Sequence, residues 1–238
     1  MYVLGIESAT PVAAVAVAGD GGILAERMVF NKRTHSVNLL PMIKAVLEES
    51  EVDRHDLIGI AVSGGPGSFT GLRIGMSTAK ALAQVWGIPV VGISTLETLA
   101  YPLSGHRNLI CPILNARKNE VYTAIYDYTG PDPARLGGLL AVRPGELVEI
   151  LLKFNRFVTF LGDGVPVYGS DLKAGMGELA RFAPLSANFP RGAAVAELGL
   201  TALREGRSDD PMALLPEYIR PSEAEVVWLE KHCPRGSK

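Results

Sequence analysis

A glycine-rich stretch over residues 63–75, Ser-Gly-Gly-Pro-Gly-Ser-Phe-Thr-Gly-Leu-Arg-Ile-Gly, is the part of the chain best suited to chemistry. It precedes a predicted helix, and free backbone N–H groups at a helix start can bind an anion such as phosphate. Glycine is also what a tight turn between a strand and a helix requires. The stretch is not a Walker A loop, because Leu72 and Arg73 follow Gly71 where lysine and serine or threonine are needed. Both interpretations stay open, and we favour the structural turn.

Histidine and cysteine, which most often bind metals or act as nucleophiles, are few and scattered. The chain holds four histidines and two cysteines, and Cys111 and Cys233 lie far apart with no ligand spacing. A metal site needs several such ligands converging on one point. His35 and Ser36 could form an acid–base pair, but no carboxylate partner is identifiable and a helix cap explains Ser36 as well. We therefore expect no catalytic residue, no metal and no cofactor.

The composition argues against several classes of protein. The 238 residues carry a formal net charge of -2, which disfavours direct binding of nucleic acid by this chain alone. No apolar run approaches the length of a membrane span, and no signal peptide precedes the first residues. With two distant cysteines, these features predict a reduced, cytoplasmic protein without a membrane partner.

The elements that would position the glycine-rich stretch follow from the hydrophobic pattern. The apolar run before it is typical of a strand covered on both faces. The helix after it can begin at Ser68 or Thr70 as a cap and end at Gly87, with Pro89 beyond. Small residues on most faces of this helix indicate close packing. The first half of the chain predicts strands over 2–6, 12–18, 23–30, 57–62 and 89–93, helices over 36–49 and 72–86, and a short helix over 95–101 with a capping box at its start.

The second half shows a looser pattern. It predicts strands over 109–114, 121–128, 139–142 and 157–161, helices over 145–154 and 193–205, and turns at 115–120 and 162–164. From Asp209 on, Pro211, Pro216 and Pro221 favour an extended tail that lies across a surface. The order strand, strand, strand, helix, strand, helix, strand in the first half gives a mixed sheet with parallel crossovers. This is the connectivity of a ribonuclease H-like lobe, which occurs singly in nucleases and in pairs in actin-like ATPases and sugar kinases.

Residues 65–75 resemble, nearly letter for letter, the signature of the bacterial TsaB (YeaZ) family. The likeness spans nearly the whole chain, and further agreement lies at residues 6–10, 35–41, 115–122 and 216–220. It implies an α/β fold of two ribonuclease H-like lobes, as in the actin-like ATPase superfamily. Residues 1–104 would form the N-terminal lobe, and residues 105–238 the C-terminal lobe with its extended tail.

The resemblance also implies a partner role. TsaB proteins are the dimerization subunit of the complex that makes threonylcarbamoyladenosine in transfer RNA, and a larger homologue, TsaD, transfers the threonylcarbamoyl group. That homologue holds a metal through a His-x-x-x-His pair, whereas here Leu39 stands four residues after His35. The implied protein is a non-catalytic subunit that binds TsaD and helps to recruit the small ATPase TsaE. It would form a homodimer in isolation and meet tRNA only through the complex.

The helices at 36–49 and 72–86 are the predicted docking surface. The simpler interpretation is that they pack against their own sheet, and part of each helix must do so. The resemblance favours, in addition, an outer face that forms a four-helix bundle with another subunit, since obligate interfaces are apolar. The same face could form a two-fold homodimer. The residues assigned to it are Val37, Leu40, Lys44 and Leu47 from the first helix, and Arg73, Met76, Ser77 and Lys80 from the second.

Two departures from the family pattern concern nucleotide chemistry. Glu7 and Asn115 stand where the family usually has aspartate, at turns where actin-like ATPases place carboxylates for phosphate and metal. This change argues against a nucleotide-hydrolysing site. The alternative function, a stand-alone ATP-dependent phosphotransferase, would need both acids. The residues expected near a nucleotide, if one binds, are Glu7, Ser8, Asn115, Gly162 and Gly164.

Overall fold

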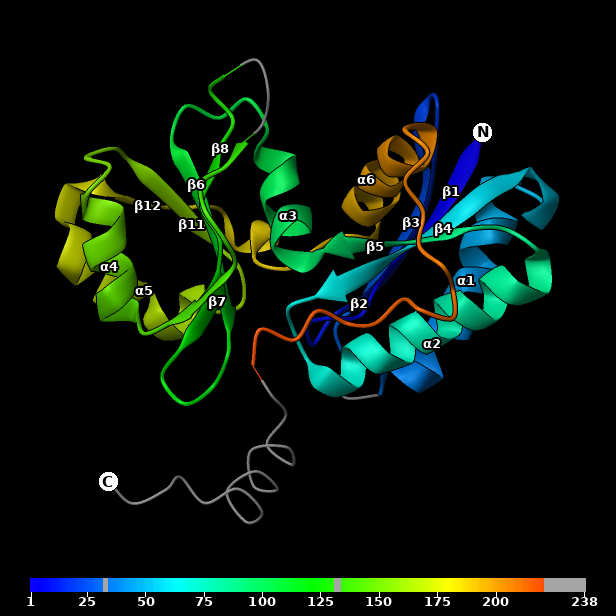
Figure 1. The fold of residues 1–238 in the computed structure, drawn as a ribbon, viewed down its shortest axis with the longest axis horizontal. Helices are drawn as coiled ribbons and strands as arrows, with labels where there is room; N and C mark the ends of the chain where they lie inside the picture. Colours follow the sequence, from blue (N-terminus) through cyan, green and yellow to red (C-terminus); the bar gives the residue numbers. More distant parts are fainter. Residues whose placement is uncertain (32–33, 131–133, 221–238) are drawn as a thin grey trace, which may run out of the picture.

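The computed structural model describes residues 1–31, 34–130 and 134–220, so Pro221 and Cys233 lie outside the described residues. Two β-sheets with flanking helices form two lobes that lie side by side (Figure 1). The chain first crosses from one sheet to the other through α3 (Thr95–Ala100). Within the described ranges, every helix is too short or too polar to span a lipid bilayer.

The first sheet has the mixed topology that the sequence predicts. Its five strands run in the order β3-β2-β1-β4-β5, with β1 antiparallel to β2 and parallel to β4. Because helices cover both faces, β1 and β2 are continuous apolar runs rather than alternating ones. The strands are β1 (Tyr2–Glu7), β2 (Ala13–Gly19), β3 (Gly22–Val29), β4 (Leu57–Gly65) and β5 (Val90–Ser94).

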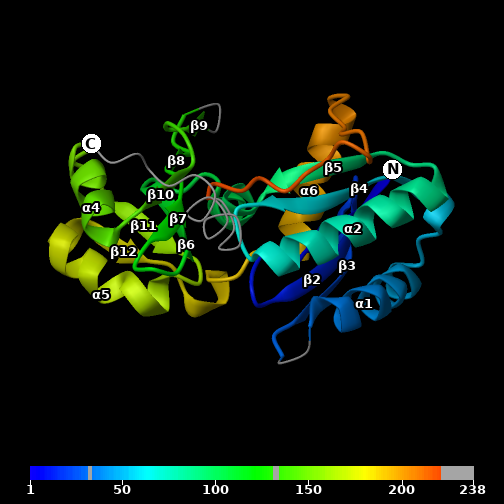
Figure 2. The same ribbon diagram turned by 60° about the horizontal axis from the view of Figure 1, so that its bottom comes forward.

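Helices α1 (His35–Ser50) and α2 (Phe69–Trp86) cover one face of this sheet (Figure 2). The predicted end of α2 and the cap at Ser68 are confirmed, although the helix begins at Phe69 rather than at Leu72. Its start is capped by Ser68, whose hydroxyl accepts a hydrogen bond from the Gly71 N–H at 3.2 Å. Its last turn ends at Gly87, which adopts the left-handed conformation with φ 69°.

Helix α6 (Gly192–Arg204) covers the opposite face of the first sheet (Figure 2). It approaches the strands closely, since a Cβ at Gly199 would lie 2.2 Å from the Ala61 Cβ of β4. The predicted boundary at residue 104 assigns α6 to the C-terminal lobe. That assignment is wrong, because α6 packs on the sheet of the first lobe. The first lobe therefore combines two separate stretches of the chain, while the boundary at 104 stays a prediction.

The second sheet is built around β6. This strand pairs antiparallel with β7 and β8 and parallel with β11, and β11 pairs with the edge strand β12. Helices α4 and α5 pack on one face, and α3 packs on the other. The elements are β6 (Leu109–Asn115), β7 (Val121–Thr123), β8 (Tyr126–Asp127), β9 (Ala134–Arg135), β10 (Leu140–Val142), β11 (Val158–Leu161), β12 (Ala180–Phe182), α4 (Pro144–Leu152) and α5 (Val165–Met176), with 3₁₀ turns at Arg54–Asp56, Tyr101–Leu103, Gly177–Leu179 and Leu185–Ala187.

Several predictions for the later elements are wrong. The single strand over 121–128 is split at Ala124 and Ile125, because β7 pairs with the end of β6 while Tyr126 pairs with Ile110 near its start. The elements α5 and β12 are missing from the predicted set. The capping box of α3 does not form, since the Ser94 side chain makes no cap hydrogen bond.

Residues 209–220, which we call the C-terminal strap, leave α6 and run along α2 toward the second lobe (Figure 1). The strap is fixed by backbone hydrogen bonds. The Asp209 N–H donates to the Val90 carbonyl at 2.8 Å, and the Glu217 N–H donates to the Gly64 carbonyl at 2.7 Å. The predicted tail across a surface is thus confirmed as far as the strap extends.

Candidate functional site

The glycine-rich stretch packs directly against the turn that follows β1. The Ser8 hydroxyl donates to the Gly71 carbonyl at 2.9 Å, and the Ser8 N–H donates to the Ser63 hydroxyl at 3.1 Å. A Cβ at Gly71 would lie 2.1 Å from the Ser8 carbonyl oxygen, and one at Gly75 would lie 2.0 Å from its Oγ. The stretch needs glycine so that α2 can approach β1 closely, which supports the structural interpretation of the turn.

Glu7 lies in the interior and has no exposed surface. Its Oε1 accepts a hydrogen bond from the Ala9 N–H at 2.6 Å, while its Oε2 has no hydrogen-bond partner among the described residues. Burial raises the pKa of the Glu7 carboxyl to about 8, although hydrogen bonds from Ala9 and Ser63 oppose this. At neutral pH the group is therefore mostly a neutral acid, which is poorly suited to holding a cation.

In the second lobe, the turn at residues 162–164 also packs closely against the backbone of a neighbouring strand. The Gly164 N–H donates to the Ile113 carbonyl at 3.0 Å, and a Cβ at Gly162 would lie 2.2 Å from that same oxygen. Between the two glycines, Asp163 accepts a hydrogen bond from the Asn115 N–H at 2.9 Å, and burial raises the Asp163 pKa. The structure thus brings together Asn115, Gly162 and Gly164. In the part of the chain that the structure describes, no hydrogen bond or ion pair links them to Glu7 or Ser8.

His35 and Ser36 have separate partners. The His35 Nε2 donates to the Thr10 carbonyl at 2.9 Å, and the Ser36 hydroxyl lies 2.9 Å from the Thr34 hydroxyl. The helix cap is Thr34 rather than Ser36, so the predicted cap is wrong by two residues. Across residues 1–31, 34–130 and 134–220, no group of three or more His, Cys, Asp or Glu side chains could hold a metal ion.

The outer face of α1 carries the predicted docking residues on its accessible side. Val37 is 54% exposed and Leu40 is 56% exposed, which is unusual for large apolar side chains. Lys44 is exposed and forms an ion pair with Glu48 at 3.7 Å. Leu47 is half-buried and packs against the core of the first lobe. Three of the four α1 residues therefore lie where a partner could reach them.

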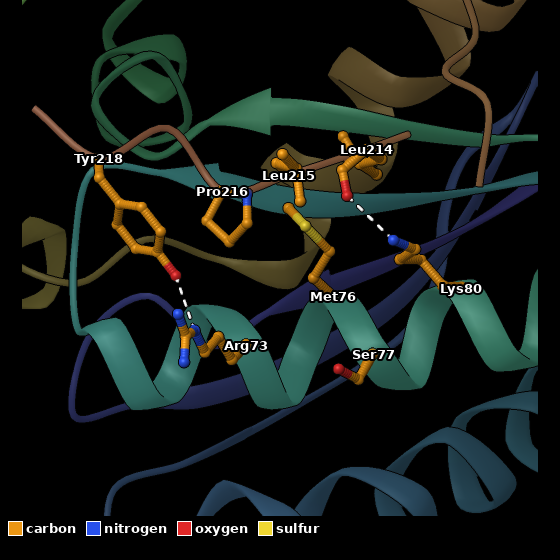
Figure 3. A pocket seen from close by; sticks show the side chains of 8 residues that line it. All are labelled: Arg73, Met76, Ser77, Lys80, Leu214, Leu215, Pro216 and Tyr218. Carbon is orange, nitrogen blue, oxygen red and sulfur yellow. Dashed lines mark hydrogen bonds between the residues drawn. The ribbon is translucent and has the colours of Figure 1, made fainter. Parts of the chain in front are cut away.

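The corresponding face of α2 is partly covered by the strap. Arg73 and Ser77 are exposed and Lys80 is half-buried, but Met76 is only 3% exposed. Met76 therefore does not lie on the accessible surface, contrary to the position the sequence predicts for it. A groove of about 390 Å³ separates helix and strap, and it is lined by Arg73, Met76, Ser77 and Lys80 from α2 and by Leu214, Leu215, Pro216 and Tyr218 from the strap (Figure 3).

Polar and aromatic contacts hold the strap on α2 (Figure 3). The Lys80 Nζ donates to the Leu214 carbonyl at 3.0 Å, and the Arg73 Nε donates to the Tyr218 hydroxyl at 3.1 Å. The Tyr218 ring stacks on the Phe69 ring with centroids 4.8 Å apart, and the Arg73 guanidinium lies 3.8 Å from the Phe69 centroid. Helix and strap thus form one continuous surface.

The strap also reaches the second lobe, which sequence reasoning missed. The Arg220 guanidinium donates to the Glu120 carboxylate at 2.6 Å, although the two residues are 100 positions apart. Before this glutamate, Arg117, Lys118 and Asn119 all have positive φ, so the turn is tightly wound. The two segments, residues 115–122 and 216–220, are both singled out in the sequence analysis. The opposite charges of Glu120 and Arg220 are the signal that could have predicted a contact between them.

Comparison with known proteins identifies relatives along almost the entire chain. The family model described as TsaD, tRNA N6-adenosine threonylcarbamoyltransferase, matches residues 16–228. The tRNA threonylcarbamoyladenosine biosynthesis protein TsaB of Bacillus subtilis is 32% identical over 230 residues, which cover 97% of this chain and 99% of that protein.

Solved structures share the fold. An uncharacterised Pseudomonas aeruginosa protein described as similar to peptidase YeaZ gives a TM-score of 0.77 at 23% identity, covering 92% of this chain and 99% of that one. An ADPNP-bound activator of 2-hydroxyisocaproyl-CoA dehydratase from Clostridium difficile gives 0.51 at 12% identity, covering 87% and 97%. At identities this low, the structural likeness shows the fold alone. It confirms the predicted two-lobed, actin-like architecture.

Proposed function

Because the chain belongs to the TsaB (YeaZ) family, we propose that it is a non-catalytic subunit of the complex that forms threonylcarbamoyladenosine in tRNA. A part in this biosynthesis is supported by the name of the relative that matches over its full length. The chain binds the catalytic homologue TsaD, helps to recruit the small ATPase TsaE, and meets tRNA only through that complex. Its place of action is the cytoplasm, where tRNA is modified.

The observation that carries the partner role is the exposure of Val37 and Leu40 on consecutive turns of α1. Each side chain leaves about half of its surface exposed, so burying that part would stabilise an association by on the order of 1 kcal/mol each before the costs of binding. Residues three positions apart share a helix face, so both can enter one interface. We assign Lys44 of α1 and Arg73 and Ser77 of α2 to the same docking face, which pairs with two helices of TsaD.

The same face serves a homodimer when TsaD is absent. A two-fold contact requires a self-complementary surface, and an apolar helix pair meets this need without any change of conformation. The two assemblies therefore compete for one surface. Leu47 and Met76 support the face from beneath, because one is half-buried and the other is covered by the strap.

The absence of catalysis by this chain is supported by the packing of its two turns. Glu7 is buried and mostly neutral at pH 7, and Ser8 packs directly against Gly71 and Gly75 of α2. Glycine contacts at the Ile113 carbonyl close the second turn. A nucleotide-proximal role for Asn115, Gly162 and Gly164 stays a prediction.

The test is a tRNA modification assay with purified components. TsaD, TsaE, the threonylcarbamoyl adenylate and unmodified tRNA are combined with and without this chain, and the modified nucleoside is quantified. Modification that requires both TsaD and this chain supports the proposal. ATP turnover by this chain alone, or modification that is equally fast without it, would favour the stand-alone phosphotransferase instead.

A further inference from the structure

The groove between α2 and the strap has a distinctive chemistry. Its floor is apolar, formed by Met76 with Leu214 and Leu215, and Leu215 leaves 75% of its surface exposed. Arg73 and Lys80 stand at its two ends. Among the residues that the structure describes, no carboxylate forms an ion pair with either cation. An occupant with an apolar centre and acidic flanks would complement this groove.

The spacing of the two cations defines the size of the occupant. Arg73 and Lys80 lie seven residues apart on one helix, which corresponds to about 10 Å along the axis. A peptide segment of two to three helical turns would cover this distance. The cavity of about 390 Å³ is large enough for one bulky aromatic side chain.

The chain carries a segment with this chemistry directly after the strap. Residues 222–230 read Ser-Glu-Ala-Glu-Val-Val-Trp-Leu-Glu, with three glutamates and no lysine or arginine. Ala224, Val227 and Trp228 have the i, i+3, i+4 spacing that would place them on one face of a helix. The acidic residues precede and follow this apolar centre, as the groove requires.

The segment can reach the groove within its own chain. Tyr218 already lines the groove, and Trp228 follows ten residues later. Because Arg220 is held at Glu120 of the second lobe, the free tether is the eight residues from Arg220 to Trp228. Eight residues span about 12 Å as a helix and up to about 26 Å when extended, and the extended length exceeds the roughly 10 Å between Arg73 and Lys80 along α2. A tethered segment also has a high effective concentration, which favours the same chain over a second copy.

We propose that residues 222–230 bind in the groove of their own chain, with Trp228 over the apolar floor and glutamates facing Arg73 and Lys80. This docking stands independently of the proposed function.

The test uses the two tryptophans of the chain, Trp86 and Trp228. In a full-length Trp86→Phe variant, Trp228 is the only tryptophan and reports its own environment. We expect its emission to be blue-shifted, and its acrylamide quenching several-fold weaker, relative to a peptide of residues 221–238. Adding Lys80→Glu should return both values toward those of the peptide. Lys44→Glu on α1 makes the same change of charge outside the groove and should have no effect.

Further measurements make each outcome decisive. Lys80→Gln keeps a donor for the Leu214 carbonyl while removing the charge, and it should weaken the protection of Trp228 without moving the strap. Circular dichroism checks that each variant is folded. Peptide-like emission in Trp86→Phe, or protection that survives Lys80→Glu, would overturn the proposal. Protection that grows with protein concentration would mean docking on a second copy and would overturn it as well. No partner protein is present, so these results leave the proposed function untouched.

Discussion

Tyr218 stacks on Phe69 with their ring centroids 4.8 Å apart, and it thereby anchors the C-terminal strap to the first turn of α2. Its hydroxyl also accepts a hydrogen bond from Arg73, one turn further along the helix. Two residues later, Arg220 pairs with Glu120 of the second lobe. The strap therefore connects both lobes and forms part of the surface beside the predicted docking face.

Replacing Tyr218 tests this anchor. Tyr218→Ala removes the stacked ring and the hydrogen bond, and it should lower the free energy of unfolding by about 1–2 kcal/mol. Tyr218→Phe keeps the ring and loses only the hydrogen bond, so its loss should be smaller. Urea denaturation of both variants measures the difference. Equal stability of Tyr218→Ala and the wild type would show that the strap is not anchored there.

The ion pair between Arg220 and Glu120 is expected to couple the lobes modestly. Both side chains are about one-third exposed or less, so the pair is screened less than a fully exposed one. A double-mutant cycle with Arg220→Ala and Glu120→Ala should give a coupling free energy of about 1 kcal/mol. Strictly additive effects of the two substitutions would contradict the contact.

The close packing of Ser8 on α2 predicts an unusual response to alanine. Alanine normally stabilises a helix relative to glycine by about 1 kcal/mol, but the Cβ of Gly75→Ala would lie 2.0 Å from the Ser8 Oγ. We expect a loss of about 1–3 kcal/mol in the free energy of unfolding. Gly145→Ala in α4 is the matched control, because its Cβ meets open space, and it should not destabilise. Combining Gly75→Ala with Ser8→Ala should cost less than the two separate effects together.

The buried Glu7 predicts how stability depends on pH. Its pKa is about 8 in the folded chain and near its usual 4.5 when unfolded, so the folded state binds the extra proton between these values. Its contribution to stability is complete below pH 4.5 and is lost as the pH rises through about 8. Glu7→Gln should remove this pH dependence, whose total change in the free energy of unfolding is at most on the order of 4–5 kcal/mol. Denaturation series from pH 5 to about 9 measure it, and identical slopes in both proteins would refute the assignment.

The first lobe could be predicted from the sequence because its signals are local. Its strands were predicted from apolar runs in the sequence. The limits of α2 were predicted to within a few residues from a cap at Ser68 and the glycine at position 87. The position of α6 could not be predicted, because its apolar face fits either sheet. Its partner strands are identified by contacts that are not local in sequence, such as the close approach of Gly199 to Ala61 in β4 and of Gly192 to Val15 in β2.

The missed elements have weak local patterns. Helix α5 contains Pro166, Gly169 and Gly175, which are typical of loops, and β12 has only three residues. The accessible residues of α1 were assigned from the family resemblance, which implies an outer docking face on this helix. The same argument failed for Met76, because the segment that covers it lies far along the chain. Helical periodicity predicts which side chains point away from the sheet, but it does not predict which distant segment of the chain packs over them.

The central claim is that the α1 face binds TsaD, and Leu40→Glu tests it most directly. Leu40 is 56% exposed, so a glutamate there should not disturb the fold, whereas Met76→Glu would bury a charge. Leu185→Glu makes the same substitution in the second lobe at a side chain that is 79% exposed. Sedimentation velocity of mixtures with TsaD measures binding. We predict that Leu40→Glu weakens the association at least tenfold, or about 1.4 kcal/mol, while Leu185→Glu leaves it unchanged. Wild-type affinity in Leu40→Glu would contradict the account.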